Sequence, residues 1–296
     1  MKLLIIFLAF FIFAGCNNDS KLNSQVVKTE NINHFLSTVE LPETLEFCGE
    51  KYPLDEPEVR ERAERELLLL LQQPGQVILY FKRSGRYFPM FEKYLKEANV
   101  PDDLKYLSVA ESALYMSRSS AGAMGLWQFM PETAKQMGLI VNDFVDERRH
   151  PEKSTKAAIK YLRQGYSEHK SWLLTAAGYN MGFAGVANNT SFQNSKDYFE
   201  LFLNEETSRY LFRIAIIKEI MDHPEKYNFI STEIEKYDPY KHYTVNVDSE
   251  INDLSAWARA NGTTYKEIKI LNPWILKRNL PRPGKGQYYE IALPKK

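Results

Sequence analysis

Alternation of apolar and polar residues with a period of two is nearly absent from this chain before residue 240. Such alternation marks half-buried strands, so its absence predicts that this long region is mostly helical. Apolar spacing, acidic first turns and Gly or Pro stops predict helices that begin at Pro101 and at Pro151 or Ser154, and others over residues 56–73, 91–98, 131–137, 172–180 and 206–221. The sequence RYFP at residues 86–89 is expected to break any helix before residue 91.

The pattern changes after residue 240. Residues 243–247 alternate as a strand does, residues 254–261 and 265–271 have helical spacing, and residues 288–293 indicate a closing strand. The sequence therefore predicts a mainly α protein that ends in a small β-α-α-β module. Its 296 residues suffice for one large domain or for two to three small ones.

Composition excludes several classes of protein. Apolar residues make up 44% and charged residues 26%, which is typical of a globular chain rather than a disordered or multi-span membrane protein. Lys and Arg number 38 and Asp and Glu also number 38, so there is no basic surplus and we expect no nucleic-acid partner. The two cysteines and five histidines have no metal-ligand spacing, and nucleotide motifs are absent, so we expect no metal and no organic cofactor.

The N-terminus predicts export and lipid attachment. Lys2 precedes an apolar run over residues 3–14, which is shorter than the roughly 20 residues that span a bilayer and fits a secretory signal. The sequence FAGC at residues 13–16 resembles a bacterial lipobox, whose Cys is lipidated; an ordinary signal peptide that contains a Cys is the alternative. We expect a lipoprotein signal peptide over residues 1–15, a lipid on Cys16 that binds the membrane, and a flexible tether over residues 16–40.

These features predict a location in the bacterial cell envelope, facing the periplasm, with the outer membrane favoured over the inner membrane. Once Cys16 carries lipid, Cys48 has no disulfide partner. We expect Cys48 to be a buried structural thiol.

Glu111 is a candidate general acid. In the helix that follows Pro101, Leu104, Leu107 and Glu111 fall on one face, so a carboxylate lies on the apolar stripe. Burial disfavours the ionised form and raises the pKa of a carboxyl group, as a general acid at neutral pH requires. The structural alternative is a buried Glu that caps a loop or pairs with an Arg.

Two further segments carry polar side chains in apolar surroundings. Gln128 lies in the sequence GLWQFM at residues 125–130, and its neutral amide can bind sugar hydroxyl or acetamido groups. Tyr179 and Asn180 end a helix of small residues, AAGYNMG at residues 176–182, which permits the close approach of another segment. Each motif alone is weak evidence for a site, because aromatic stripes usually belong to a core.

Together and in this order, the segments ES (111–112), GLWQFM (125–130) and AGYNMG (177–182) resemble the three motifs of the soluble-lytic-transglycosylase type catalytic domain. Three more sequences resemble the membrane-bound lytic murein transglycosylase D branch: RYFP (86–89), PDDLKYL (101–107) and DERRHP (146–151). The resemblance covers roughly residues 41–229. It departs at Gly178, where the family more often has Ala, and at Tyr115-Met116, where a polar residue and a Pro are usual.

The resemblance implies a lysozyme-like helical fold, with peptidoglycan glycan strands as substrate. It gives Glu111 the position of the catalytic acid/base and Ser112 a supporting one, and it assigns cleft positions that bind substrate to Gly125, Gln128, Met130, Tyr179 and Asn180. It also implies a mechanism with one carboxylate. Glu111 protonates the oxygen that links N-acetylmuramic acid to N-acetylglucosamine, and then accepts the proton of the muramoyl 6-hydroxyl, which closes onto C1 as a 1,6-anhydro sugar.

Two other functions stay open at this point. A hydrolytic muramidase would need a second carboxylate, for which Asp143, Asp146 and Glu147 are the nearest candidates, with surface or structural roles as the alternative. A non-catalytic peptidoglycan-binding lipoprotein would have no need of an intact Glu111 motif. The sequence indicates no particular protein partner.

The C-terminal module resembles a LysM domain, a β-α-α-β binder of peptidoglycan, through Leu254, Trp257, Gly262 and Asn272-Pro273. The usual Gly-Asp-Thr after the first strand is replaced by DSE at residues 248–250, so the resemblance supports the fold better than glycan binding. The expected domains are an N-terminal helical extension (41–100), a lysozyme-like catalytic domain (101–235) and a LysM-like module (240–296).

Overall fold

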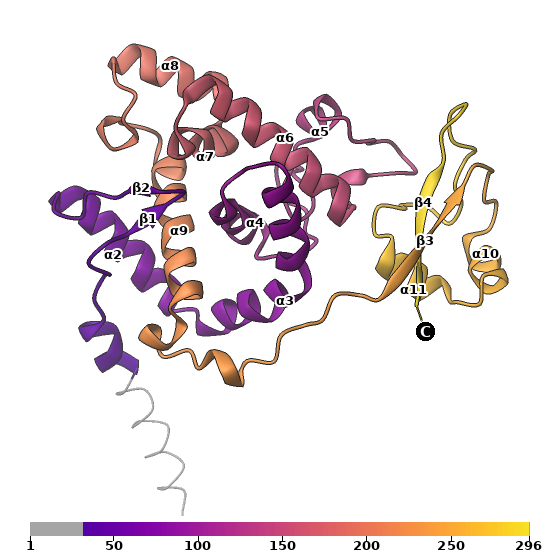
Figure 1. Ribbon diagram of the computed structural model, residues 1–296, viewed down its shortest axis with the longest axis horizontal. Coiled ribbons are helices and arrows are strands. Elements are labelled where there is room, and N and C mark those ends of the chain that lie inside the picture. Colours follow the sequence, from indigo (N-terminus) through magenta and orange to yellow (C-terminus); the bar gives the residue numbers. More distant parts are fainter. Residues whose placement is uncertain (1–31, 296) are drawn as a thin grey trace, which may run out of the picture. The chain divides into compact units, whose positions relative to one another are not determined.

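The computed structural model describes residues 32–295 (Figure 1). The predicted signal peptide, the lipidation site Cys16 and tether residues 17–31 lie outside the described residues. Residues 32–40 belong to a separate unit with a short helix over residues 32–38. Within residues 32–295, no helix is both long and apolar enough to cross a bilayer.

The second unit begins at Leu41 and is mainly helical. A short hairpin, β1 (Glu46–Phe47) and β2 (Glu50–Lys51), precedes eight helices: α2 (Pro57–Leu71), α3 (Pro74–Glu97), α4 (Lys105–Ser112), α5 (Pro131–Gln136), α6 (Pro151–His169), α7 (Trp172–Met181), α8 (Phe183–Gln193) and α9 (Glu205–Asp222). The module that follows contains β3 (His242–Val247), α10 (Leu254–Ala260), α11 (Tyr265–Leu271) and β4 (Tyr289–Pro294). The predicted mainly α class and the C-terminal β-α-α-β order are confirmed.

Helix α9 forms the centre of the helical part. Eleven of its 18 residues are buried, so the helix is apolar around most of its circumference, as a core helix must be. It contacts α2, α4 and α7, and Figure 1 shows it in orange beside α2 and α4. This packing places the first turns of α9 next to the last turn of α4.

The predicted break at residues 86–89 is wrong, because α3 runs without interruption from Pro74 to Glu97 with Pro89 inside it. Helix α2 ends at Leu71, before Pro74 as the sequence predicts, and Pro74 also begins α3. Residues buried by packing lie on both sides of Pro89, and this burial outweighs the one backbone hydrogen bond that a proline removes. The helix is also supported from outside, where the Tyr237 backbone N–H donates to the Lys82 carbonyl at 2.7 Å. Helix α8 was not predicted.

Cys48 lies in the tight turn between β1 and β2, with a φ of +54° followed by Gly49 at +79°. Its thiol is free and the residue is partly buried rather than fully buried as expected. Its backbone N–H donates to the Asp103 carboxylate at 2.7 Å. The hairpin therefore holds the chain just before α4.

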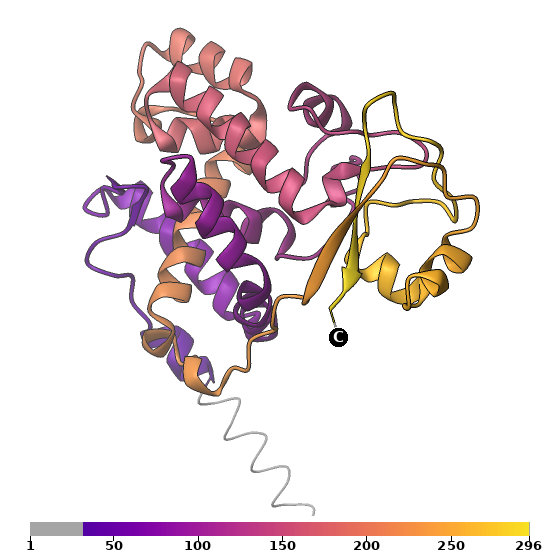
Figure 2. The same ribbon diagram turned by 45° about the vertical axis from the view of Figure 1, so that its right-hand side comes forward.

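The C-terminal module is a two-stranded antiparallel sheet with α10 and α11 packed beside it, coloured yellow and light orange in Figure 2. Val245 pairs with Ile291, and the core of the module is formed by buried side chains that include Leu254, Ile268 and Leu293. Val145, from the long connection between α5 and α6, belongs to the same core and is 2% exposed. The module is therefore completed by a residue from the helical part.

Candidate active site

Helix α4 carries Glu111 on its last turn. Asp102–Leu104 form a 3₁₀ turn that leads into the helix, which ends where Ala113 and Leu114 both adopt left-handed φ angles of +53° and +54°. Leu104 and Leu107 are fully buried on the same face. Glu111 follows on this stripe but is only partly buried, so its carboxylate leaves the core and faces a pocket.

The pocket has a volume of about 600 Å³ and is lined by the C-terminal turns of α4 and α7 and by the first half of α9. Its charged and polar lining comprises Glu111, Asn180, Glu205, Glu206, Arg209, Tyr210 and Arg213. On the α9 wall, Glu205 and Glu206 lie in the first turn and Arg209 and Arg213 follow, so the pocket offers both donors and acceptors to a polar ligand such as a sugar.

Burial raises the pKa of Glu111 to about 7. The Tyr210 hydroxyl donates a 2.6 Å hydrogen bond to Oε1 of Glu111, which lowers the pKa, whereas the negative charge of Glu206 raises it. Arg213 lowers it by a smaller amount. Near pH 7, Glu111 therefore exchanges readily between a proton-donating and a proton-accepting form, as a general acid/base must.

Ser112 ties α4 to the segment that follows it. Its hydroxyl lies 2.8 Å from the Leu126 carbonyl, and the Ser108 hydroxyl lies 2.9 Å from the same oxygen. Ser112 is buried, so it contacts the protein interior and supports the last turn of α4 rather than lining the pocket.

Gly125 is required by the local geometry. Its φ is +89°, and a Cβ at this position would lie 2.0 Å from the carbonyl oxygen of Arg148. The backbone at residue 125 therefore packs directly against the backbone at Arg148, and Gly125 has no side chain that could bind a ligand. The close approach lets residues 125–130 pack against the segment before α6.

Gln128 and Met130 lie away from the pocket lining. Gln128 has a φ of +46°, and its amide Nε2 donates to the Gly125 carbonyl at 2.8 Å and to the Ser117 carbonyl at 3.2 Å. Met130 is 41% exposed and precedes α5. The amide of Gln128 therefore braces the loop between α4 and α5.

Tyr179 and Asn180 come from the last turn of α7. The Tyr179 hydroxyl donates to the Trp127 carbonyl at 2.7 Å, and the negative charge of Glu111 contributes to the raised pKa of Tyr179, after burial, which places the two side chains close together. Asn180 lines the pocket, where its Oδ1 accepts from the Thr207 hydroxyl at 2.8 Å and its Nδ2 lies 3.4 Å from Glu206.

The structure thus brings Glu111, Tyr179 and Asn180 together, with Ser112 and Gly125 behind them. Sequence reasoning missed the wall formed by α9. Its signal was present, because Glu206, Tyr210 and Arg213 are spaced i, i+4 and i+7 and so share one helix face.

None of the three carboxylates proposed as a second acid or base lines the pocket. Asp146 accepts two hydrogen bonds from the Arg148 guanidinium, at 2.9 and 2.8 Å. Glu147 accepts from the Ile140 backbone N–H at 2.7 Å and from Lys153 at 2.6 Å. Asp143 is exposed. The additional carboxylates of the pocket are Glu205 and Glu206.

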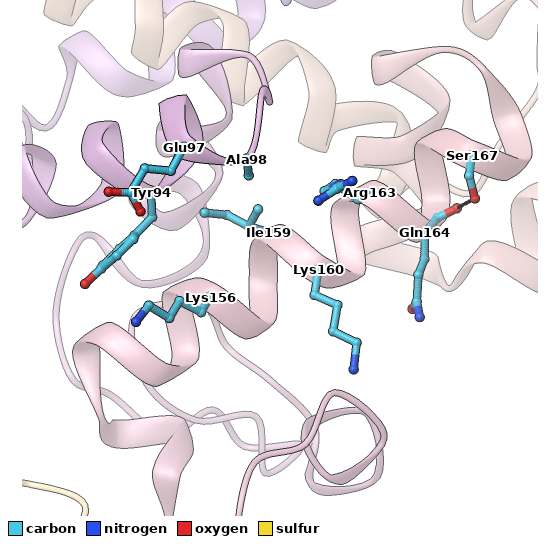
Figure 3. A pocket seen from close by; sticks show the side chains of 9 residues that line it. All are labelled: Tyr94, Glu97, Ala98, Lys156, Ile159, Lys160, Arg163, Gln164 and Ser167. Carbon is cyan, nitrogen blue, oxygen red and sulfur yellow. Dashed lines mark hydrogen bonds between the residues drawn. The ribbon is translucent and has the colours of Figure 1, made fainter. Parts of the chain in front are cut away.

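Another cavity, of about 560 Å³, lies between the end of α3 and α6 (Figure 3). Figure 3 shows Lys156, Lys160 and Arg163 along α6 on one side of it and Tyr94 of α3 on the other. No residue of the three motifs lines this cavity, so it is separate from the candidate active site. In residues 32–295, no group of His, Cys, Asp and Glu side chains is arranged to hold a metal ion.

Two parts of the chain match known families. Residues 88–202 match the transglycosylase SLT domain, and residues 243–296 match the soluble lytic transglycosylase C-terminal LysM-like domain. One part of the chain therefore matches an SLT domain and another matches a LysM-like domain, as the sequence motifs predicted.

Individual proteins are also similar to this chain. Membrane-bound lytic murein transglycosylase D from Escherichia coli K12, and the protein of the same name from E. coli O6:H1 strain CFT073, are each 28% identical over 256 residues, which is 84% of this chain. The chain spans about half the length of these curated relatives, 55%. A crystal structure of an inactive mutant of lytic transglycosylase Slt from Pseudomonas aeruginosa is similar with a TM-score of 0.39 and 22% identity, over 51% of this chain and 26% of that one.

Proposed function

We propose that this protein is a peptidoglycan lytic transglycosylase. It cleaves the β-1,4 bond between N-acetylmuramic acid and N-acetylglucosamine without adding water, and Glu111 acts as the single acid/base. The observation that carries the proposal is a carboxyl group with a pKa of about 7 that faces a polar pocket within the SLT match. The names of the relatives support the same activity.

The first step requires a protonated Glu111. With a pKa of about 7, roughly half of the carboxyl groups are protonated at neutral pH. The proton moves to the glycosidic oxygen as the bond between that oxygen and C1 of muramic acid breaks. The acetamido group of the same sugar stabilises the positive charge that develops at C1.

The second step uses the carboxylate that remains. It accepts the proton of the muramoyl 6-hydroxyl while that oxygen bonds to C1, which gives the 1,6-anhydro product and restores the acid. Tyr210 donates its hydrogen to Glu111 at 2.6 Å, so it stabilises the ionised form between the two steps. The phenol stays protonated, because burial and Glu111 together raise the pKa of Tyr210 well above its ordinary value.

Hydrolysis is the second candidate reaction, and Glu206 is the observation that favours it. Glu206 lines the same pocket and is close enough to raise the pKa of Glu111 by its charge. Mass spectrometry of digested sacculi distinguishes the reactions: a transglycosylase leaves anhydro-muramyl ends, whereas a muramidase leaves ends heavier by one water. A folded protein that binds sacculi and releases no fragment would instead be a non-catalytic binding lipoprotein.

We further propose that a lipid on Cys16 anchors the protein in the envelope, facing the periplasm. Support comes from the lipobox-like sequence at residues 13–16 and from the words "membrane-bound" in the names of the relatives. The expected result is that the wild-type protein sediments with the outer membrane, whereas Cys16→Ala moves to the soluble fraction. Equal membrane association of both proteins would contradict the lipid anchor.

The pH dependence of cleavage tests the role of Tyr210. Because the acid must be protonated, the rate is expected to fall as the pH rises through about 7. Tyr210→Phe removes the hydrogen bond that lowers the pKa of Glu111, so the alkaline limb is expected to move to higher pH and the maximal rate to fall. Tyr198→Phe is the control, because it removes a buried 3.0 Å bond to the Ser208 carbonyl and leaves Glu111 untouched. An unchanged alkaline limb in Tyr210→Phe would contradict this coupling.

A further inference from the structure

The LysM-like module is fixed to the helical part by backbone pairing. The Asp146 N–H donates to the Trp274 carbonyl at 2.9 Å, and the Leu276 N–H donates to the Phe144 carbonyl at 2.8 Å. Between these bonds, Val145 pairs with Ile275 and is buried in the core of the module. Two hydrogen bonds and a shared core join the module to the helical part, so the two parts form joint surfaces.

One such surface encloses a cavity of about 860 Å³, within the usual size range of ligand sites. Its walls come from α3, from residues 114–116 just after Glu111 and Ser112, and from residues 269–273 and strand β4 of the module. Arg83 joins the cavity to the catalytic segment, because its Nη1 donates to the Ala113 carbonyl at 2.9 Å. The lining of the cavity therefore includes Leu114, three residues after the candidate acid in the sequence, and residues of the module.

Positive charge in this cavity is not balanced. Lys153 is paired with Glu147 and Glu290, and Lys156 is paired with Glu152. The other three cations of the lining, Arg83, Arg86 and Lys269, form no ion pair with a carboxylate among residues 32–295. Each donates to a backbone carbonyl, that of Ala113, Asp238 and Ile275 respectively, and Arg86 also bonds the Tyr87 side chain. In a chain with equal numbers of acidic and basic residues, three such cations in one cavity favour an anionic ligand.

Tyrosine rings stack on the two arginines. The Arg83 guanidinium lies 5.1 Å from the Tyr115 ring centre, and the Arg86 guanidinium lies 4.3 Å from that of Tyr240. Stacking covers only the face of a guanidinium, so the N–H donors in its plane can still bind a carboxylate that lies in the same plane. Both rings are well exposed, at 59% and 46%, and offer apolar contact beside the charges. Carboxylates on a partly apolar chain fit this lining.

We propose that this cavity binds the acidic stem peptides of the peptidoglycan strand whose sugars lie at Glu111. The inference rests on the proposed function, because a strand at Glu111 carries its peptides on the lactyl groups of muramic acid. Arg83, Arg86 and Lys269 bind the peptide carboxylates, and Tyr115 and Tyr240 contact the chain between them. The module thus contributes to substrate choice through the wall it shares with the helical part.

The test compares two substrates with the full-length protein in detergent. One is strands with intact stem peptides, and the other is the same strands after an amidase has removed the peptides. Wild type is expected to have the higher kcat/KM on peptide-bearing strands. Arg86→Gln/Lys269→Gln is expected to lose at least tenfold in kcat/KM on these strands and to match wild type on peptide-free strands. Should the double variant unfold, each single variant is expected to show a smaller loss in the same direction.

The matched control is Lys277→Gln/Arg278→Gln, which removes the same charge from exposed positions of the module outside the cavity. It is expected to behave as wild type on both substrates. Equal loss by the two double variants, or an equal effect of Arg86→Gln/Lys269→Gln on both substrates, would overturn the proposal.

Direct binding separates this inference from the proposed function. Glu111→Gln protein is titrated with a fluorescently labelled free stem tetrapeptide, and binding is expected to weaken at least tenfold when Arg86→Gln and Lys269→Gln are added. If wild type cleaves neither substrate, the proposed activity fails, and this titration still decides the cavity. No binding of the tetrapeptide would overturn the inference alone.

Discussion

Glu111→Gln is expected to abolish cleavage of sacculi and to leave the protein folded. The amide has the size of the carboxyl group and can still accept from Tyr210, but it has no proton to give to the glycosidic oxygen. Because one residue serves as both acid and base in the proposed mechanism, its loss should lower kcat by at least roughly 10³-fold. Release of anhydro-muramyl fragments, followed by mass spectrometry, measures the effect.

Stability supplies an independent readout of the same variant. In the unfolded chain a Glu titrates near pH 4.3, whereas Glu111 in the folded protein titrates near pH 7. The folded state therefore holds its proton more tightly, and the stability that the neutral carboxyl provides is complete below about pH 4 and is lost as the pH rises to 7. Gln does not titrate. Relative to wild type, the variant should gain roughly 3 kcal/mol in unfolding free energy between pH 4 and pH 8.

The control for both measurements is Asp143→Asn. Asp143 is exposed and does not line the pocket, so its variant should keep full activity and the stability profile of the wild type. Full activity of Glu111→Gln would remove Glu111 from the mechanism. An inactive Asp143→Asn variant would mean that a second carboxylate, outside the pocket, takes part in the reaction.

How much of this site the sequence predicts depends on whether its residues interact locally. The i, i+3, i+7 spacing of Leu104, Leu107 and Glu111 suffices to predict both the face of the helix and the raised pKa, because helix geometry is local. Tyr210 lies 99 residues away and meets Glu111 only through the packing of α9 on α4. Such a contact follows from tertiary structure, and single-sequence periodicity carries no information about it.

The same distinction between local and tertiary interactions explains where the predicted fold differs from the structure. Pro89 favours a break locally, but burial on both sides of it keeps α3 continuous. Val145 gives no sign in the sequence that it completes the core of a module more than 100 residues further on. The short helices of that module were predicted closely, because caps such as Thr264 with Glu267 are local signals.

Gly125 is constrained both by its local backbone conformation and by a tertiary contact. Its positive φ is a local property that Gly meets without strain. The oxygen that a side chain would strike belongs to Arg148, and that residue is held in place: its guanidinium bonds Asp146 and donates to the Gly122 and Phe129 carbonyls, each at 3.0 Å. The neighbour therefore has little freedom to move aside.

Gly125→Ala is consequently expected to lower the free energy of unfolding by at least about 4 kcal/mol, which is exceptional for one methyl group. Gly122→Ala is the matched control, because its φ of +92° is nearly the same and a Cβ there would meet nothing within 4 Å. It should cost only the backbone strain, about 1–2 kcal/mol. Denaturant unfolding measures the free energy of unfolding of both variants, and the difference between them is the cost of the contact with Arg148. Equal stabilities would mean that the Arg148 backbone moves aside at little cost. Because the Leu126 and Trp127 carbonyls accept from Ser112 and Tyr179, any Gly125→Ala protein that folds should also cleave more slowly than Gly122→Ala.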